Sequence, residues 1–349
     1  MVTHLHKENP VTQGINRRDF VKGTVLASAG AALTMAANKP AASAEAASPP
    51  AAPQTGLPKG KIGKMEISRL LLGGNLLTHF THSRELRYVY NLAAHYNTEK
   101  KILETLAMAE QQGINTLVVH TAANGIVGLL KKHREKHGGK IQWIICPTNP
   151  IEPGLAKYEE QVQQLVDDGV DAIYVWGVQT DSLNSQGKID LVGKAVDLVK
   201  THGVSCGVGA HMLTVVQECE KSKIAADFYI KTFHHHNYNS AATVTVAGHG
   251  RGLTEKSLNL KTLEANHDAM WCFTPEETAA FMNGVAKPWI AFKVMAAGAI
   301  PPPDAFRYAF EHGADFVLAG MFDYEIAEDV RIATETLAKL PKRARPWCG

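Results

Sequence analysis

The chain has 349 residues, of which 45% are hydrophobic and 20% are charged, and its formal net charge is +2. These proportions are typical of globular proteins and exclude both an intrinsically disordered chain and a strongly basic, nucleic-acid-binding one. The five cysteines show no CxxC spacing, which excludes a zinc knuckle and a complete disulfide framework but is compatible with one bridge.

The first 44 residues have the order of an export signal. Arg17 and Arg18 precede a mildly apolar stretch at 23–37, and small residues at 42–46 offer a cleavage site. The apolar stretch is shorter than the roughly 20 residues that span a bilayer permanently. The segment resembles a twin-arginine signal, which implies that the twin-arginine translocation machinery exports the folded chain to the periplasm or beyond.

An Ala/Pro-rich linker is predicted at 45–58, followed by a single domain at 59–349. No later stretch is long and apolar enough for a permanent membrane span. The net charge gives no reason to expect a nucleic-acid partner, and we expect a small-molecule substrate instead. The basic run at 342–345 is predicted to be a solvated tail.

Short β-branched runs alternate with amphipathic helical patterns along the domain. The predicted strands are 69–74, 116–120, 142–146, 172–176, 205–211, 227–233, 289–295 and 316–320, and the clearest helices are 98–112, 158–168, 191–202, 305–312 and 326–340. Glycines at the helix ends precede several strands. The sequence therefore predicts an α/β fold, a (β/α)8 TIM barrel, with a doubly wound open sheet as the alternative.

A ninth apolar run at 269–273 does not fit eight strands. It precedes a helix start at Thr274 and Pro275, and the Gly-rich segment 247–252 lies upstream of it. Both are assigned to a long connection between the sixth and seventh strands. The segment 78–96, rich in His, Tyr and Arg, is interpreted as a lid or an interface, with a solvated surface excursion as the alternative.

In a parallel barrel the functional residues follow the strands at their C-terminal ends. The polar residues at these positions are Asn75, His120, Gln179, His211, Lys231, His234, Lys293 and Asp323.

Two lysines lie inside apolar strand runs, where surface lysines are unusual. Lys231 in the segment 226–233 and Lys293 in the segment 289–294 resemble the paired lysines of class I deoxyribose-phosphate aldolases. The resemblance covers the last third of the chain and implies Lys231 as the Schiff-base nucleophile and Lys293 as the group that tunes its pKa. Such a mechanism requires no cofactor. The alternative is that both lysines pair with buried carboxylates or extend to the rim.

Small residues follow the seventh and eighth predicted strands, where barrels commonly bind phosphates. Gly298, Ala299, Gly320 and Asp323 are therefore candidates for binding a cofactor phosphate or a substrate carboxylate. Tight packing of helix on strand explains the small residues equally well.

Three consecutive histidines begin at His234. With His120 and His211 across the barrel mouth, they are compatible with a divalent metal site, although no obvious carboxylate ligand accompanies them. A histidine beside the lysines would also serve as a general acid or base. The alternative is that the histidines are solvated or hydrogen-bonded.

The front half, at 67–74, 113–122 and 170–179, resembles the aldo-keto reductases in its spacing. The resemblance implies carbonyl reduction with NADPH by an Asp, a Tyr, a Lys and a His. Here the Asp position is Val118 or His120, the Lys falls near Pro147 or Thr148, and the His is Gln179, so the tetrad is missing.

Three functions remain open from the sequence. The first is a lysine-dependent aldolase, lyase or isomerase that acts on the carbonyl of a small sugar-like or hydroxy-acid substrate, with Lys231, Lys293, His234, His120 and His211 as its catalytic candidates. The second is an NADP-dependent reductase with a diverged site. The third is a His-metal hydrolase or a non-catalytic binding barrel.

Overall fold

The structure, a computed structural model, describes residues 56–83, 86–122, 125–238, 272–340 and 342–349. The predicted export signal, its cleavage site, the linker up to residue 55 and the Gly-rich segment 247–252 lie outside these residues. All described residues belong to one compact unit, Pro50–Gly349.

Eight parallel strands close into a barrel, in the order β10-β3-β4-β5-β6-β7-β8-β9. They are β3 (Leu70–Gly73), β4 (Thr116–His120), β5 (Gln142–Cys146), β6 (Ala172–Val175), β7 (Ser205–Ala210), β8 (Phe228–Thr232), β9 (Trp289–Phe292) and β10 (Phe316–Ala319). Each lies within one of the eight predicted runs. Pairing of Leu70 with Val317 closes the ring and confirms the TIM barrel over the open sheet.

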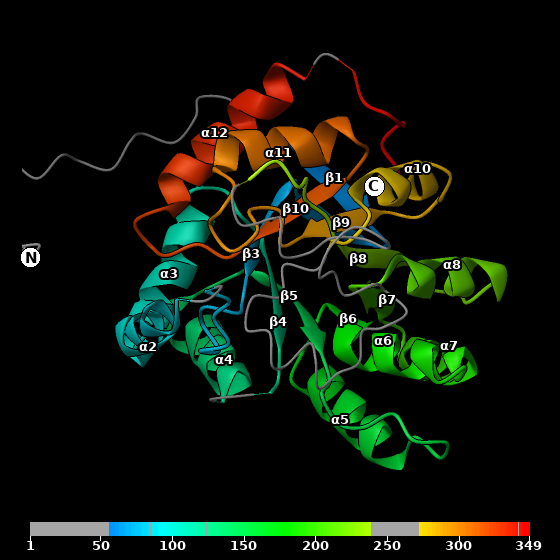
Figure 1. Cartoon of the computed structure of the whole chain (residues 1–349). Coiled ribbons are helices and arrows are strands. Elements are labelled where there is room, and N and C mark those ends of the chain that lie inside the picture. The colour runs from blue at the N-terminus through cyan, green and yellow to red at the C-terminus, as the bar shows by residue number, and fades with distance from the viewer. Residues whose placement is uncertain (1–55, 84–85, 123–124, 239–271, 341) are drawn as a thin grey trace, which may run out of the picture. The chain divides into compact units, whose positions relative to one another are not determined.

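Helices surround the strands (Figure 1). They are α2 (Arg87–Tyr96), α3 (Glu99–Gln111), α4 (Ile126–His137), α5 (Ala156–Asp167), α6 (Gly177–Ser185), α7 (Ile189–Thr201), α8 (Leu213–Lys221), α10 (Pro275–Met282), α11 (Pro302–Glu311) and α12 (Ile326–Ala338). Gly113 and Gly313 follow helices with φ of 91° and 107°, a conformation that side chains with a Cβ rarely adopt. These glycines end the helices where the sequence predicts.

A short hairpin absent from the sequence prediction covers one end of the barrel. Its antiparallel strands are β1 (Lys59–Ile62) and β2 (Met65–Ser68). Ile62, Met65 and Ile67 pack into the barrel interior. Because β2 leads into the start of β3, the hairpin fills the end opposite to the C-terminal ends of the strands.

Side chains that alternate along each strand form two separate apolar layers. Val118, Ile144, Phe228 and Ile230 belong to the interior cluster of the barrel. Their sequence neighbours, such as Val119 and Tyr229, belong to the larger cluster between the barrel and the helices. This alternation determines which residues at the strand ends face the barrel mouth.

The last described residues seal the base of the barrel. Asp315 is 0% exposed and forms ion pairs with both Arg343 and Arg345, and Arg345 is only 5% exposed. Arg345 also donates to the backbone carbonyls of Met282 and Gly313. The prediction of a solvated basic tail is therefore wrong for these arginines, because a buried carboxylate from a distant loop neutralises them. We call Asp315, Arg343 and Arg345 the basal cluster.

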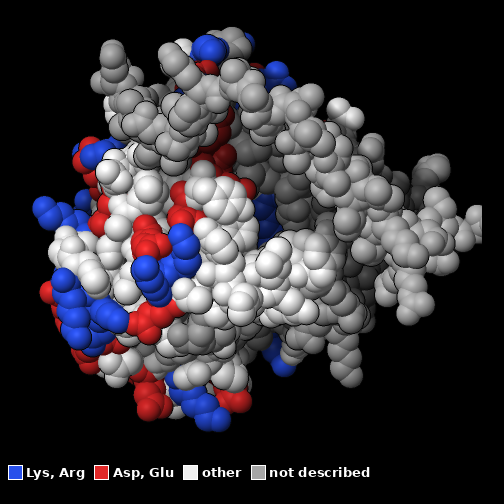
Figure 2. Space-filling model, turned by 90° about the vertical axis from the view of Figure 1, so that its left-hand side faces the viewer, with Lys and Arg blue, Asp and Glu red and all other residues white. Residues whose placement is uncertain are grey.

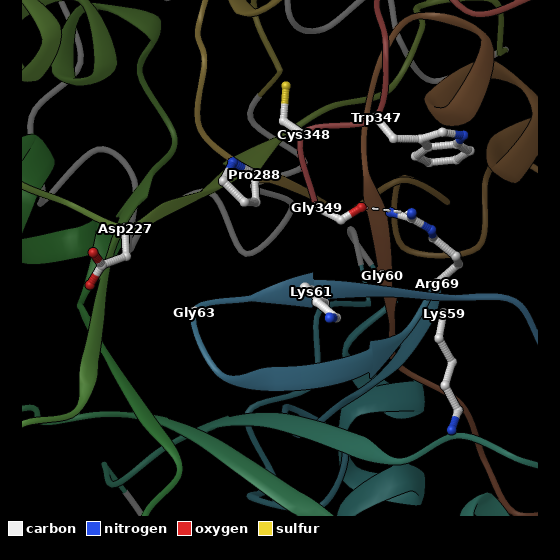
Figure 3. A pocket seen from close by; sticks show the side chains of 10 residues that line it. All are labelled: Lys59, Gly60, Lys61, Gly63, Arg69, Asp227, Pro288, Trp347, Cys348 and Gly349. Atoms are coloured by element: carbon white, nitrogen blue, oxygen red, sulfur yellow. Dashed lines mark hydrogen bonds between the residues drawn. The ribbon is translucent and has the colours of Figure 1, made fainter.

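A pocket of about 650 Å³ lies beside the basal cluster, lined by Lys59, Gly60, Lys61, Gly63, Arg69, Asp227, Pro288, Trp347, Cys348 and Gly349 (Figure 3). Arg69 donates to the carbonyl of Gly349 at 2.7 Å, and its guanidinium stacks 3.8 Å from the Trp347 ring. The pocket lies at the end of the barrel where residues usually serve stability rather than catalysis.

Cationic and anionic side chains are mixed on the face shown in Figure 2 and do not form one patch of a single sign. All five cysteines lie among the described residues and are free thiols, so the compatible disulfide is not formed. Within the described part of the chain, no helix combines the length and apolar character needed to cross a bilayer.

Candidate active site

A histidine and an aspartate form a buried pair where β7 ends. Nδ1 of His211 lies 2.6 Å from Oδ2 of Asp181, which belongs to α6. The Asp181 carboxylate also accepts the backbone N–H groups of His211 and Met212. The carboxylate thus requires the proton on Nδ1, and Nε2 is the basic nitrogen. Burial lowers the pKa of His211 against the opposing effect of Asp181, which favours a neutral base.

Lys293 follows β9 and places its amine in the barrel mouth. Its Nζ lies 3.0 Å from Nε2 of His82 and 5.6 Å from the centre of the Phe292 ring. Its φ of 58° is rare for a residue other than glycine, and this strained turn breaks the strand alternation after the inward-facing Phe292. Burial lowers the pKa of Lys293 to about 7, opposed by Asp181. A large fraction of this amine is therefore neutral near pH 7.

His82 lies in the loop after β3, and only β10 separates β3 from β9 in the barrel, so His82 reaches Lys293 from close by. Burial lowers its pKa well below the usual value, and Lys293, His211 and His120 lower it further. These electrostatic effects place the four groups in one neighbourhood. His82 is thus a neutral partner for the Lys293 amine.

Lys231 lies at the end of β8 and is only 1% exposed. Phe228 and Ile230 point into the barrel and Tyr229 points toward the helices, so Lys231 leaves the strand on the helix side. Its Nζ donates to the carbonyl and the hydroxyl of Thr232, at 2.9 and 3.1 Å. Lys231 still lowers the pKa of His211, so it contributes positive charge to the mouth.

His120 ends β4 and uses both ring nitrogens in protein hydrogen bonds. Nδ1 accepts the backbone N–H of Ala122 at 3.1 Å, so the proton lies on Nε2, which donates to Thr78 Oγ1 at 3.0 Å. Burial lowers its pKa to about 4. The ring is stacked on Trp176 and contacts Phe80 edge-on. This geometry suits a wall of the mouth better than a proton carrier.

His234 follows β8 and is hydrogen-bonded to the next residue and to a residue 38 positions further along the chain. Its Nδ1 lies 3.0 Å from the carbonyl of His235, and its Nε2 accepts the backbone N–H of Cys272 at 3.4 Å. Next to it, His236 Nε2 lies 2.5 Å from the carbonyl of Cys272. Among the residues that the structure describes, no group of three or more His, Cys, Asp or Glu side chains is arranged to hold a metal ion.

The predicted phosphate turns lie after β9 and β10. Gly298 has a φ of 81° and is exposed, Ala299 is half-buried, and Gly320 lies at the end of β10. Asp323 is occupied by the protein itself, because it accepts Lys101 Nζ at 2.6 Å and the Tyr96 hydroxyl at 2.7 Å.

The turn after β10 does not suit a cofactor phosphate. The Phe322 N–H, which could bind an anion, donates to the Glu325 carboxylate at 2.8 Å. Burial together with Glu325 and Glu328 raises the pKa of the nearby Asp329 to about 7. A phosphate here would have to displace one carboxylate and approach others, which like charges oppose.

The residues at the positions of the missing reductase tetrad have structural roles. Val118 is part of the interior core. Gln179 donates to the carbonyls of Thr148 and Asn149 and accepts the N–H of Ile151 at 2.9 Å. Val118 and Gln179 therefore offer no acid to protonate the carbonyl oxygen during reduction, and both ring nitrogens of His120 are already hydrogen-bonded within the protein.

The sequence singles out the segment that contains His82 but not the role of His82, and it does not single out Asp181. The buried Asp181 comes four residues after Gly177, which begins α6 without an intervening loop. A carboxylate so soon after the end of a barrel strand is a sequence signal that indicates a site residue. The proximity of His82 to Lys293 leaves no such trace, because the two residues are far apart in the chain.

No protein-family model matches the chain, and no curated protein matches it in sequence. Among solved structures it is similar to a proposed aldo-keto reductase from Pseudomonas aeruginosa, at 13% identity and a TM-score of 0.52, over 80% of this chain and 95% of that one. An aldo-keto reductase from Brucella melitensis is 12% identical, with a TM-score of 0.48 over 80% and 99% of the two chains. A variant of Gox0644 solved with NADPH is 11% identical, with a TM-score of 0.45 over 79% and 90%.

At such identities the similarity establishes the fold and leaves the chemistry to the side chains. The chain is a (β/α)8-barrel protein of the shape found in aldo-keto reductases. At its mouth, a strained lysine, a neutral histidine and a histidine–aspartate pair come together.

Proposed function

We propose that this protein is an exported barrel enzyme that forms a Schiff base between Lys293 and the carbonyl of a small sugar-like or hydroxy-acid substrate. The main observation behind this proposal is the position of Lys293, whose strained backbone turns its amine into the mouth beside His82 and near Asp181. An aldolase, lyase or isomerase reaction would follow from such an adduct.

The geometry favours an exchange of the two lysine roles that the aldolase resemblance implies. Lys293 is half-buried in the mouth, whereas Lys231 is almost fully buried, leaves its strand on the helix side and donates to Thr232. A nucleophile must reach its substrate, and Lys293 has the better access. Lys231, which lowers the pKa of His211, would supply positive charge that keeps His211 a neutral base.

His211 would act as the base in this reaction. The neutral Nζ of Lys293 attacks the carbonyl carbon, a C–N bond forms, and the electron pair of the C=O bond moves to oxygen. The nitrogen then loses a proton to Nε2 of His211, which Asp181 orients through Nδ1. Net transfer of that proton to the alkoxide oxygen gives a neutral carbinolamine and restores neutral His211. Loss of water from the carbinolamine gives the Schiff base, which withdraws electrons from the adjacent carbon.

Borohydride trapping of the mature full chain tests this proposal. Glycolaldehyde, glyceraldehyde and pyruvate serve as carbonyl probes, and peptide mass spectrometry locates the reduced adduct. We expect an adduct on Lys293 and its loss in Lys293→Arg, while the exposed Lys194 serves as an internal control for non-specific labelling. If no probe labels Lys293 above the level of Lys194, the Schiff-base mechanism is wrong.

An NADP-dependent reductase is the second candidate, favoured by the shared barrel fold. The occupied Asp323 and the Glu325 carboxylate on the Phe322 N–H argue against it. Titration with NADPH, followed by native mass spectrometry, separates the two functions, because a tight complex would favour the reductase.

A further inference from the structure

Two glycines of β7 leave the barrel interior open for aromatic rings. Gly207 and Gly209 alternate with Val208, which packs toward the helices, so both glycines face inward. A Cβ on Gly207 would collide with the Phe228 ring. A Cβ on Gly209 would lie 3.2 Å from Cδ2 of Tyr174. The Tyr174 ring, from β6, therefore lies against the bare backbone of β7.

Tyr174 remains partly exposed although it points into the barrel. In the interior cluster, Val118, Ile144 and Phe228 are buried, whereas Tyr174 and Phe292 are only partly buried and pack at its edge. Phe292 is the ring beneath the Lys293 amine. Among the described residues, Tyr174 and Phe292 are thus the two partly covered rings that pack against the interior cluster, and Phe292 also lies beside the Lys293 amine.

The neighbours of Tyr174 connect it to the site described above. Its side chain is hydrogen-bonded to Cys146, which pairs with His120 across β4 and β5. Gly177, three residues after Tyr174, lies so close to β7 that a Cβ there would be 3.3 Å from Cε1 of His211. Burial raises the pKa of Tyr174 well above its usual value and that of Cys146 to about 12, so both groups keep their protons.

We propose that Tyr174 is a further catalytic residue, whose hydroxyl donates a hydrogen bond and then a proton to the carbonyl oxygen attacked by Lys293. This inference rests on the proposed Schiff-base function. As the C–N bond forms, the O–H bond of Tyr174 breaks and its proton joins the developing alkoxide. His211 then passes the proton that it took from the amine to the Tyr174 phenolate, so His211 and Tyr174 both recover their starting states.

The test is the rate at which glycolaldehyde and borohydride label Lys293 in Tyr174→Phe, measured by peptide mass spectrometry. Removal of a general acid should slow labelling about 10²-fold. Tyr158→Phe is the matched control, because Tyr158 is a buried tyrosine of α5 without a described hydrogen-bond partner, and its labelling rate should not change. Thermal unfolding of both variants checks that they are folded.

A second variant keeps the ring and changes only the acidity of the phenol. With 3-fluorotyrosine at position 174 the phenol is a stronger acid in the same ring position, so the labelling rate on the plateau at pH 8 should be restored well above that of Tyr174→Phe. A 3-fluorotyrosine rate as low as that of Tyr174→Phe, or equal rates in wild type and Tyr174→Phe, would overturn the role of Tyr174 and leave Lys293 as nucleophile. Absence of any Lys293 adduct in the wild type would overturn both proposals.

Discussion

The Asp181 carboxylate accepts three hydrogen bonds where β7 ends: from the His211 ring Nδ1 at 2.6 Å, from the His211 backbone N–H, and from the backbone N–H of Met212. The middle of α6 and the end of β7 are thereby joined through one buried acid. The two backbone bonds fix the carboxylate, and the imidazole cannot rotate without breaking its Nδ1 bond to that carboxylate, so its Nε2 keeps a fixed direction relative to the strand.

Asp181→Asn should slow adduct formation at Lys293 by about 10²-fold or more, because the neutral amide no longer fixes the His211 tautomer. It should also lower the free energy of unfolding by about 2 kcal/mol through the weakened buried hydrogen bonds. The trapping rate and urea unfolding measure the two effects. The control is Asp190→Asn, in an exposed pair with Lys194. An unchanged trapping rate would contradict the role of His211 as base.

The reactivity of Lys293 should depend on pH around neutrality. Because its pKa is lowered to about 7, the neutral fraction and the trapping rate should rise between pH 6 and 8 and then level off. A short lysine-containing peptide, whose amine has a pKa of about 10.4, should still gain reactivity up to pH 10. A Lys293 profile that follows the peptide would show that the amine is charged at neutral pH.

Lys293→Met should stabilise the protein at low pH. Below pH 7 the Lys293 amine is charged in both states, but it is partly buried in the folded protein and hydrated in the unfolded chain. Burial of this charge lowers the free energy of unfolding. From pH 7 to 10 the unfolded chain binds more protons than the folded one, so wild-type stability rises and the advantage of methionine shrinks. We expect a gain on the order of 4 kcal/mol at pH 6, because each unit by which the pKa is lowered corresponds to about 1.4 kcal/mol. Thermal unfolding at pH 6 and pH 9 checks the sign, and a gain larger at pH 9 would contradict it.

The basal cluster should contribute strongly to stability and little to chemistry. Arg345→Ala leaves the buried Asp315 with one ion-pair partner fewer and should lower the free energy of unfolding by about 3–5 kcal/mol. The control is Arg331→Ala, whose exposed pairs with Glu328 and Glu335 should contribute less than about 1 kcal/mol. Urea unfolding compares the two variants. Similar losses would show that the basal cluster is no stronger than a surface pair.

The strand and helix pattern could be predicted because it depends on local signals. Every barrel strand lies in an apolar run, and glycines such as Gly113 mark helix ends that only a positive φ allows. The hairpin β1–β2 escaped prediction because its strands are only four residues long, β1 carries two lysines and a glycine, and β2 carries a glutamate; its apolar residues are buried only in the barrel base.

The site could be predicted only strand by strand. Lys293 and His211 were found because each follows a strand directly, but which way a side chain points depends on the register and on the strained φ of Lys293. The partner of a charged residue depends on barrel closure, which brings His82 to Lys293 and Asp315 to Arg345 from distant segments. Such partners carry no local pattern.

The pairing of Leu70 with Val317 also has a kinetic consequence. The first barrel strand has no partner on one side until the last strand has been synthesised and folded, so closure depends on contacts of very long sequence separation, which form slowly. Until then the unpaired backbone N–H and C=O groups of β3 remain a template for pairing with other chains. We therefore expect refolding yields to fall as protein concentration rises, and a chaperone that shields β3 to restore them.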